Sequence, residues 1–116
     1  MFVVRASGRV TIDEGLAIID QLRADSRLCC GVSLIVDGCN VDSAPSATDL
    51  RILAGELKPL FDQGLAAVAI FTDRTFVYGV ARMFAAFAEA FGENVHVFRT
   101  EDEARGWIEE QTPHAA

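Results

Sequence analysis

The apolar pattern of the chain is strongest between residues 65 and 91. An apolar run, Leu65–Phe71, is followed by the polar connection Thr72–Thr75 and then by an aromatic-rich segment, Phe76–Phe91, that stops at Gly92. Both alternate sets of residues in the first run are apolar, which is typical of a central strand covered on both faces. On a helix, the large apolar residues of the second segment would fall within about 100° of one another: Phe76, Val80, Met83, Phe84, Phe87 and Phe91. This pattern predicts a buried strand, a tight connection and a helix whose aromatic face is directed at the core.

Three other stretches have strand character. These further strands are predicted at residues 2–6, 31–36 and 94–98. The last alternates polar and apolar residues more than 65–71 does, so we expect it at an edge of the sheet. Ser7-Gly8-Arg9 predicts a turn after the first strand, and residues 39–45 predict a loop because they are rich in Asn, Asp, Ser and Pro.

Capping signals followed by apolar residues at helical spacing predict the remaining helices. They are expected from Thr11 to about Asp25, from Ser46 to Phe61, and from Thr100 to about Gln111. Thr11 with Glu14, and Thr100 with Glu103, have the spacing of a capping box, in which each side chain bonds the backbone N–H of the other residue. The short last helix would direct Ala104, Trp107 and Ile108 inward, and residues from Gln111 onward are expected to form a frayed tail.

The elements therefore alternate as β-α-β-α-β-α-β-α within one domain, residues 1–116. The connections are long enough for parallel pairing, and such crossovers are almost always right-handed. Two architectures remain: a sheet in sequential order with the helices largely on one face, or a doubly wound sheet. In sequential order the second face of the central strand would need a cover, which a dimer partner could supply.

Composition and charge exclude several classes of function. The chain is 51% hydrophobic and 23% charged, which is typical of a folded globular domain rather than a disordered one. Its net charge is −7, and the Lys and Arg residues are scattered singly, so we expect neither a nucleic-acid partner nor an anionic membrane surface. No apolar run approaches the ~20 residues of a membrane-spanning helix. Met1–Arg5 has no signal-peptide pattern, and we expect a cytoplasmic protein.

Four segments together resemble a known family. They are the helix start Gly8–Thr11, the strand end Leu34–Asp37, and the pairing of Tyr78–Met83 with Val95–Trp107. In these segments the chain resembles SpoIIAA-like proteins, relatives of the STAS and anti-sigma-factor-antagonist fold. The resemblance spans nearly the whole chain and implies a four-stranded, mainly parallel sheet in a sequential (βα)4 superhelix. It also implies a protein that works through contacts rather than catalysis.

The resemblance also suggests a phospho-acceptor. STAS antagonists carry a phosphorylated serine in an Asp-Ser-x-Gly motif, and the nearest match here is Asp42-Ser43-Ala44-Pro45, which lacks the glycine. A phosphate on Ser43 would lie near the start of the second helix, where exposed N–H groups favour anions. The alternative is that Ser43 is an ordinary turn or cap residue.

Candidate ligand residues lie after the predicted strands, because parallel α/β sheets bind ligands beyond the carboxyl ends of their strands. This rim contains Asp37, Asp42, Thr72, Asp73 and Arg74. Asp37 and Asp73 could hold Mg²⁺ or act as acid and base, although Asp73 is also well placed to cap the following helix. No nucleotide-binding glycine motif and no catalytic triad is recognisable, so we expect no catalytic residue, metal ion or cofactor.

Two functions are consistent with these residues. The preferred one is a non-enzymatic interaction or regulatory domain that forms a homodimer and binds a regulatory protein, with Tyr78 and Arg82 as a contact patch on the outer face of the aromatic helix. The alternative is a carrier of a small apolar ligand or lipid, with a pocket lined by Phe84, Phe87 and Phe91. An enzyme that uses the carboxylates at the strand ends is a weaker alternative.

Overall fold

The structure is a computed structural model that describes residues 1–111; residues 112–116, which include most of the predicted tail and His114, lie outside it. The described elements are β1 (Phe2–Arg9), α1 (Ile12–Ala24), β2 (Ser33–Ser43), α2 (Ala47–Glu56), α3 (Lys58–Asp62), β3 (Ala67–Phe71), α4 (Thr75–Ala90), β4 (Val95–Phe98) and α5 (Glu101–Gln111). Within residues 1–111, every helix is too short or too polar to span a lipid bilayer.

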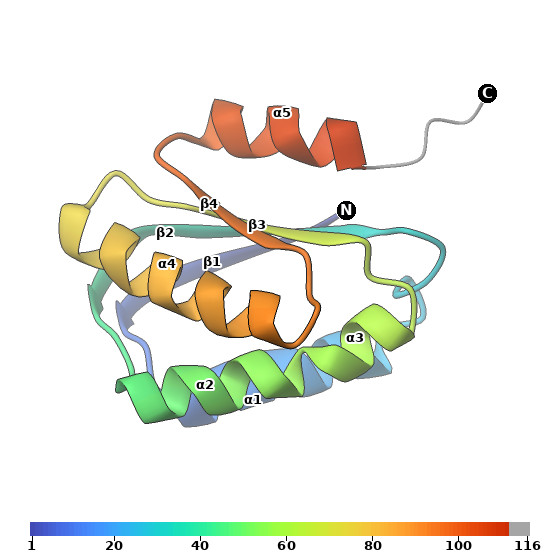
Figure 1. Cartoon of the computed structure of the whole chain (residues 1–116), viewed down its shortest axis with the longest axis horizontal. Helices are drawn as coiled ribbons and strands as arrows, with labels where there is room; N and C mark the ends of the chain where they lie inside the picture. Colours follow the sequence, from blue (N-terminus) through green and yellow to red (C-terminus); the bar gives the residue numbers. More distant parts are fainter. Residues whose placement is uncertain (112–116) are drawn as a thin grey trace.

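The four strands form one parallel sheet in the order β1-β2-β3-β4. The predicted sequential order is therefore confirmed, with β3 inside the sheet and β4 at an edge. Because each crossover advances the sheet in the same direction, α1, α2, α3 and α4 lie on one face, whereas α5 alone lies on the other (Figure 1). The molecule consists of three layers.

The central strand β3 is covered on both faces by the chain itself. Ala67, Ala69 and Phe71 pack against Ala104 and Ile108 of α5, and the alternate residues of the strand face the main core under the other helices. The prediction of a strand buried on both sides is confirmed. A dimer partner is not needed as the cover, because the short last helix folds back over the open face.

The strands β1 and β2 are longer than the sequence pattern indicated. The predicted turn at residues 7–9 and most of the predicted loop at residues 39–45 are wrong, because β1 continues to Arg9 and β2 to Ser43. The two segments pair with each other there, with two register shifts that accommodate the irregular polar sequence. Pairing between segments about 35 residues apart overrides the local preference of Asn, Asp and Ser for turns.

The second predicted helix is two helices. The helix α2 ends at Glu56 and α3 begins at Lys58, with Pro59 in the first turn of α3. Proline has no backbone N–H and cannot continue the hydrogen-bond ladder of a preceding helix, whereas it is well tolerated in a first turn. The break therefore follows directly from Pro59.

The helix α4 does not direct its aromatic stripe at the core. Its buried positions are Val77, Ala81 and Ala88, whereas Phe76, Met83 and Phe91 are 65%, 41% and 43% exposed. Phe84 and Phe87 lie half-buried between these two sets. The predicted core face was therefore partly wrong, because Phe84 and Phe87 pack against the core whereas Phe76, Met83 and Phe91 do not turn toward it.

Candidate functional site

The end of α4 explains why residue 93 is buried. Gly92 has a φ of +79°, and its N–H donates to the carbonyl oxygen of Glu89 over 2.9 Å. The N–H of Glu93 donates to the carbonyl oxygen of Ala88 over 3.0 Å. These two bonds form a Schellman motif, in which the residue two positions beyond the cap usually makes a hydrophobic contact with the last turn. In this chain that residue is Glu93, which is 5% exposed.

The carboxylate of Glu93 has no hydrogen-bond partner in the described structure. Both of its oxygens are buried, and burial raises the pKa of Glu93 from 4.5 to about 7, although the positive charge of Lys58 opposes the rise. Lys58 itself lies 3.9 Å from a carboxylate oxygen of Asp62. A buried, unpartnered carboxylate destabilises a fold, and such groups occur more often at functional sites than elsewhere. Glu93 therefore marks a candidate site.

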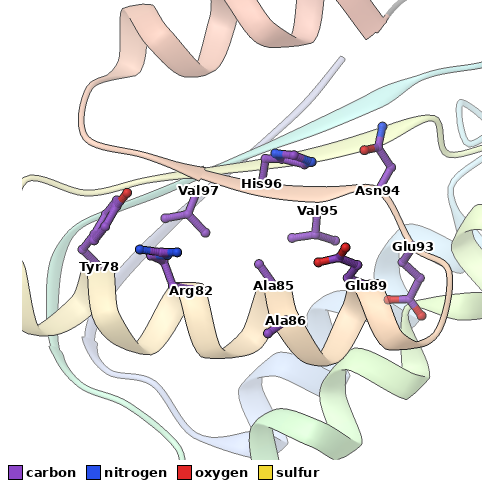
Figure 2. Close-up of a pocket in the computed structure, with 10 residues that line it drawn as sticks. All are labelled: Tyr78, Arg82, Ala85, Ala86, Glu89, Glu93, Asn94, Val95, His96 and Val97. Carbon is purple, nitrogen blue, oxygen red and sulfur yellow. The ribbon is translucent and has the colours of Figure 1, made fainter.

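Glu93 lines a groove of about 660 Å³ between α4 and β4. Figure 2 shows Tyr78 and Arg82 at one end of the groove, Glu89 and Glu93 at the other, and Ala85 between them on α4. The groove thus has a basic end and an acidic end. Small alanines along α4 leave the space between these ends open.

A second arginine lies at the basic end. The guanidinium carbon of Arg99, in the residue directly after β4, lies 3.8 Å from the centroid of the Tyr78 ring. This cation–π contact holds Arg99 beside the predicted contact pair of Tyr78 and Arg82. Tyr78 and Arg82 therefore both line the groove, and Arg99, which sequence analysis missed, lies beside them on the ring of Tyr78.

The strand β4 borders the groove with a free edge. Backbone N–H groups of residues 68 and 72 donate to the carbonyl oxygens of Asn94 (2.9 Å) and Phe98 (3.1 Å). Because alternate residues of a parallel strand bond to the same neighbour, Val95 and Val97 direct their N–H and C=O groups away from β3. Among the described strands, the sheet order places none on that side. Such an edge can accept an added strand.

The side chains of β4 alternate between the two faces of the sheet. Val95 and Val97 point toward α4 and line the groove, whereas His96 points to the opposite side (Figure 2). There the His96 ring lies 4.7 Å from the ring of Trp107 on α5. His96 is exposed.

A solved structure matches the fold of this chain. It is the crystal structure of an uncharacterized protein of the DUF3478 family with a SpoIIAA-like fold from Shewanella loihica PV-4, which superimposes with a TM-score of 0.59 and 16% sequence identity. The match covers 91% of this chain and 82% of that one. The chain has a SpoIIAA-like fold. By sequence, no protein-family model and no curated protein matches it.

In this SpoIIAA-like domain, one predicted rim residue lies inside the protein. Thr72 is fully buried; its hydroxyl donates to the carbonyl oxygen of Gly38 over 3.1 Å and accepts from the N–H of Arg74 over 3.2 Å. These bonds join the end of β3 to the middle of β2. Thr72 is a structural link between neighbouring strands and is not accessible to a ligand.

The start of α4 differs from the prediction as well. The cap residue is Arg74, without a side-chain capping bond, and not Asp73. Arg74 instead extends back to β2, where its Nη1 donates to the carbonyl oxygen of Val41 (2.9 Å) and to a carboxylate oxygen of Asp42 (3.2 Å). The SpoIIAA-like domain thus uses two predicted rim residues, Arg74 and Asp42, to attach α4 to the extended end of β2.

Asp37 and Asp73 both lie near the thiol of Cys39. One carboxylate oxygen of Asp37 accepts from the N–H of Cys39 over 3.0 Å, and the other lies 3.8 Å from Nη1 of Arg5. Burial raises the pKa of Cys39, the N–H of Asp73 opposes the rise, and the two nearby carboxylates add to it. Within residues 1–111, no three His, Cys, Asp or Glu side chains are placed to hold a metal ion.

Ser43, the predicted phospho-acceptor, is the last residue of β2. Its carbonyl oxygen accepts from the N–H of Val10 over 3.1 Å. The residue that caps α2 is Ser46, whose hydroxyl accepts from the N–H of Asp49 over 3.2 Å. Ser43 therefore precedes the cap by three residues, and phosphorylation there stays a prediction.

Two apolar cavities lie beneath the helices of the SpoIIAA-like domain. One, of about 190 Å³, lies between α1, α2 and the sheet; the other, of about 140 Å³, lies between α2, α4 and the end of β2. Phe84 lines both, as does Ala6 of β1, whereas Phe87 and Phe91 lie outside them. The predicted apolar pocket thus involves one of its three predicted rings.

Proposed function

We propose that this domain is a non-enzymatic protein-interaction domain and that its binding surface is the groove between α4 and the free edge of β4. The observation that carries the proposal is the position of Glu93, a buried carboxylate without a hydrogen-bond partner in the part of the chain that the structure describes, at one end of a groove that runs along an open strand. Its volume of about 660 Å³ falls within the range of binding clefts, roughly 300–1,000 Å³.

The groove is suited to an extended peptide segment. Such a segment would add to the sheet as a fifth strand, with main-chain hydrogen bonds to Val95 and Val97 and every second side chain between β4 and α4. A basic side chain would be favoured near Glu93, and an acidic one near Arg82 and Arg99. Strand addition would therefore combine affinity from main-chain hydrogen bonds with selectivity for the charge of the peptide side chain at each end of the groove.

A peptide-display selection tests this proposal. Val97→Pro removes one outward N–H and leaves the bonds to β3 intact, because proline is tolerated on an edge strand at such a position. Val97→Thr, of similar shape, keeps the N–H and is the matched control. We expect selected peptides to bind the unsubstituted domain and the threonine variant equally and to bind the proline variant at least tenfold more weakly. Equal binding by the proline variant would contradict strand addition.

The apolar cavities support a second candidate, the binding of a small apolar ligand. In another protein, an enclosed apolar cavity of about 150 Å³ stays dry and binds benzene or xenon; the larger apolar cavity here, of about 190 Å³, is similar in size but open to solvent. Ala6→Leu would fill space common to both cavities, whereas Val3→Leu changes the opposite face of the same strand. We expect benzene to raise the melting temperature of the protein and of the Val3 variant, but not of the Ala6 variant. No shift in any of them would exclude this candidate.

We further propose a cytoplasmic location and a protein partner rather than a nucleic acid or a membrane. Cys29, Cys30 and Cys39 are free thiols, and free thiols are typical of a reducing compartment. The net charge of −7 opposes binding to phosphate-rich surfaces.

A further inference from the structure

The groove has features that a second copy of the same chain would complete. We propose that β4 pairs antiparallel with the β4 of a partner subunit, about a two-fold axis that passes at His96, and so joins two four-stranded sheets into one. This inference rests on the proposed function and names the occupant of the groove.

The free edge determines the register of such a pair. Val95 and Val97 have their N–H and C=O groups directed outward, and residues that exchange hydrogen bonds face each other in an antiparallel pair. Val95 then faces Val97 of the partner subunit and exchanges backbone hydrogen bonds with it. The two-fold axis places the same bonds between Val97 and the partner's Val95. His96 faces the partner's His96 in the position between these bonded pairs.

The same register brings opposite charges together. In this register Glu93, two residues before Val95, faces the partner's Arg99, which lies two residues after Val97 of the partner subunit. Glu93 lines the groove, Val95 and Val97 point toward α4 (Figure 2), and Arg99 contacts the ring of Tyr78 on that helix, so this pair lies on the face that carries α4. Arg99 is already held on the ring of Tyr78 at the basic end. The partner's Arg99 would therefore supply the counter-charge that the buried Glu93 lacks among residues 1–111 of its own chain.

The two adjacent registers lack this complementarity. If Val95 faced its own copy, Glu93 would face an apolar side chain, the partner's Val97. If Val97 faced its own copy, Glu93 would approach the partner's Glu101, and like charges opposite each other are destabilising. Only the register centred on His96 pairs both outward valines and neutralises Glu93. The overall charge of −7 opposes association, and this local pairing offsets it.

Disulfide trapping tests the register directly. In a background with Cys29, Cys30 and Cys39 replaced by serine, His96→Cys places two thiols opposite each other, with Cα atoms about 4.5 Å apart, within the range of a disulfide. Arg99→Cys is the matched control, because its thiol would face the partner's Glu93 and lie roughly 20 Å from its own copy at about 3.3 Å per residue. We expect a covalent dimer from the first variant under mild oxidation and none from the second.

Sedimentation equilibrium tests the energetics. We expect the unsubstituted chain to dimerise and Arg99→Glu and Val97→Pro each to weaken the dimer at least tenfold. Arg23→Glu makes the same charge change on the exposed surface of α1 and should leave the dimer unchanged. Circular dichroism of each variant confirms that it is folded.

The outcomes separate this inference from the proposed function. A monomer at all concentrations, with peptide binding that Val97→Pro abolishes, overturns the self-pairing and leaves the groove as a peptide site. A dimer that neither Val97→Pro nor Arg99→Glu weakens also overturns the self-pairing, because the contact between subunits then lies elsewhere. The peptide-display selection still tests whether the groove binds peptides. Equal trapping of His96→Cys and Arg99→Cys overturns the register.

Discussion

The N–H of Glu93 donates to the carbonyl oxygen of Ala88 over 3.0 Å, so the turn that ends α4 also buries the Glu93 carboxylate. Replacing that carboxylate by a hydrocarbon should stabilise the monomer, because the position favours an apolar contact. We expect Glu93→Leu to raise the free energy of unfolding by about 1–3 kcal/mol at pH 8. Glu89→Leu, on the exposed surface, should change it by less than about 0.5 kcal/mol.

The pH dependence of this gain has a definite sign. The pKa of Glu93 is raised from 4.5 to about 7, so the folded chain binds the proton more tightly than the unfolded chain. The contribution of Glu93 to the free energy of unfolding is therefore fully present below pH 4.5. It is lost as the pH rises toward 7 and does not change further above pH 7. The upper limit of this loss is about 3 kcal/mol. Urea titrations of dilute protein at pH 5 and pH 8 should show a larger gain from Glu93→Leu at pH 8; an equal gain would contradict the raised pKa.

The hydroxyl of Thr72 supports a second prediction. Thr72→Val would leave the carbonyl oxygen of Gly38 and the N–H of Arg74 without their bonds to this side chain. We expect a loss of about 1–3 kcal/mol in the free energy of unfolding, because the site is fully buried. Thr72→Ser keeps the hydroxyl and should be less destabilising. Denaturant titration measures both, and a valine variant at least as stable as the serine variant would contradict a contribution from the two hydroxyl bonds.

The rotation of α4 lowers the expected cost of truncating its rings. A fully buried Phe87 would lose about 3–5 kcal/mol on change to alanine. The ring is half-buried, so we expect about 1–2 kcal/mol for Phe87→Ala. Phe76→Ala, at a side chain that is 65% exposed, should change stability by less than about 0.5 kcal/mol. Thermal or urea unfolding measures the loss of stability in both variants. Equal losses for Phe76→Ala and Phe87→Ala would mean that the Phe76 ring also packs against other residues.

The attachment of α5 depends on its single tryptophan. The Trp107 ring lies 4.7 Å from that of His96 and 5.6 Å from that of Phe98, so it holds the helix to β4. We expect Trp107→Ala to lower the free energy of unfolding by about 2–4 kcal/mol, whereas Glu109→Ala on the exposed side should have little effect. Far-UV circular dichroism during urea unfolding measures both. A negligible loss for Trp107→Ala would mean that Ala104 and Ile108 hold α5 to the sheet without the ring contacts of Trp107.

Several features that depend on residues close together in the chain were predicted correctly, although the cap at Asp73 and the continuous helix through Pro59 were not. The hydroxyls of Thr11, Ser46 and Thr100 each accept from the N–H three residues on, and Gly92 ends α4 in a left-handed conformation. These bonds join residues no more than a few positions apart, so the local sequence specifies them. The same signal could have identified Glu93, because a carboxylate directly after a helix-ending glycine occupies a position that is usually apolar.

Features that depend on distant contacts were missed. The extension of β2 to Ser43 requires pairing with β1, and the exposure of Phe76 and Phe91 depends on how α4 is rotated against the sheet. The sequence predicted Thr72 to lie on the rim, whereas its bond to Gly38 places it inside the protein. In each case a contact between segments far apart in the chain overrode a local preference.

The sequence by itself determined the order of strands and helices, the parallel sheet, the doubly covered β3 and the edge position of β4, because hydrophobic periodicity and capping record which faces must be buried. Only the tertiary structure decided that α5 supplies the second cover, and that Glu93, the free edge of β4 and the charges of Arg82 and Arg99 meet in one groove. Periodicity shows that a face needs a neighbour, but the identity of that neighbour depends on how the elements pack in three dimensions.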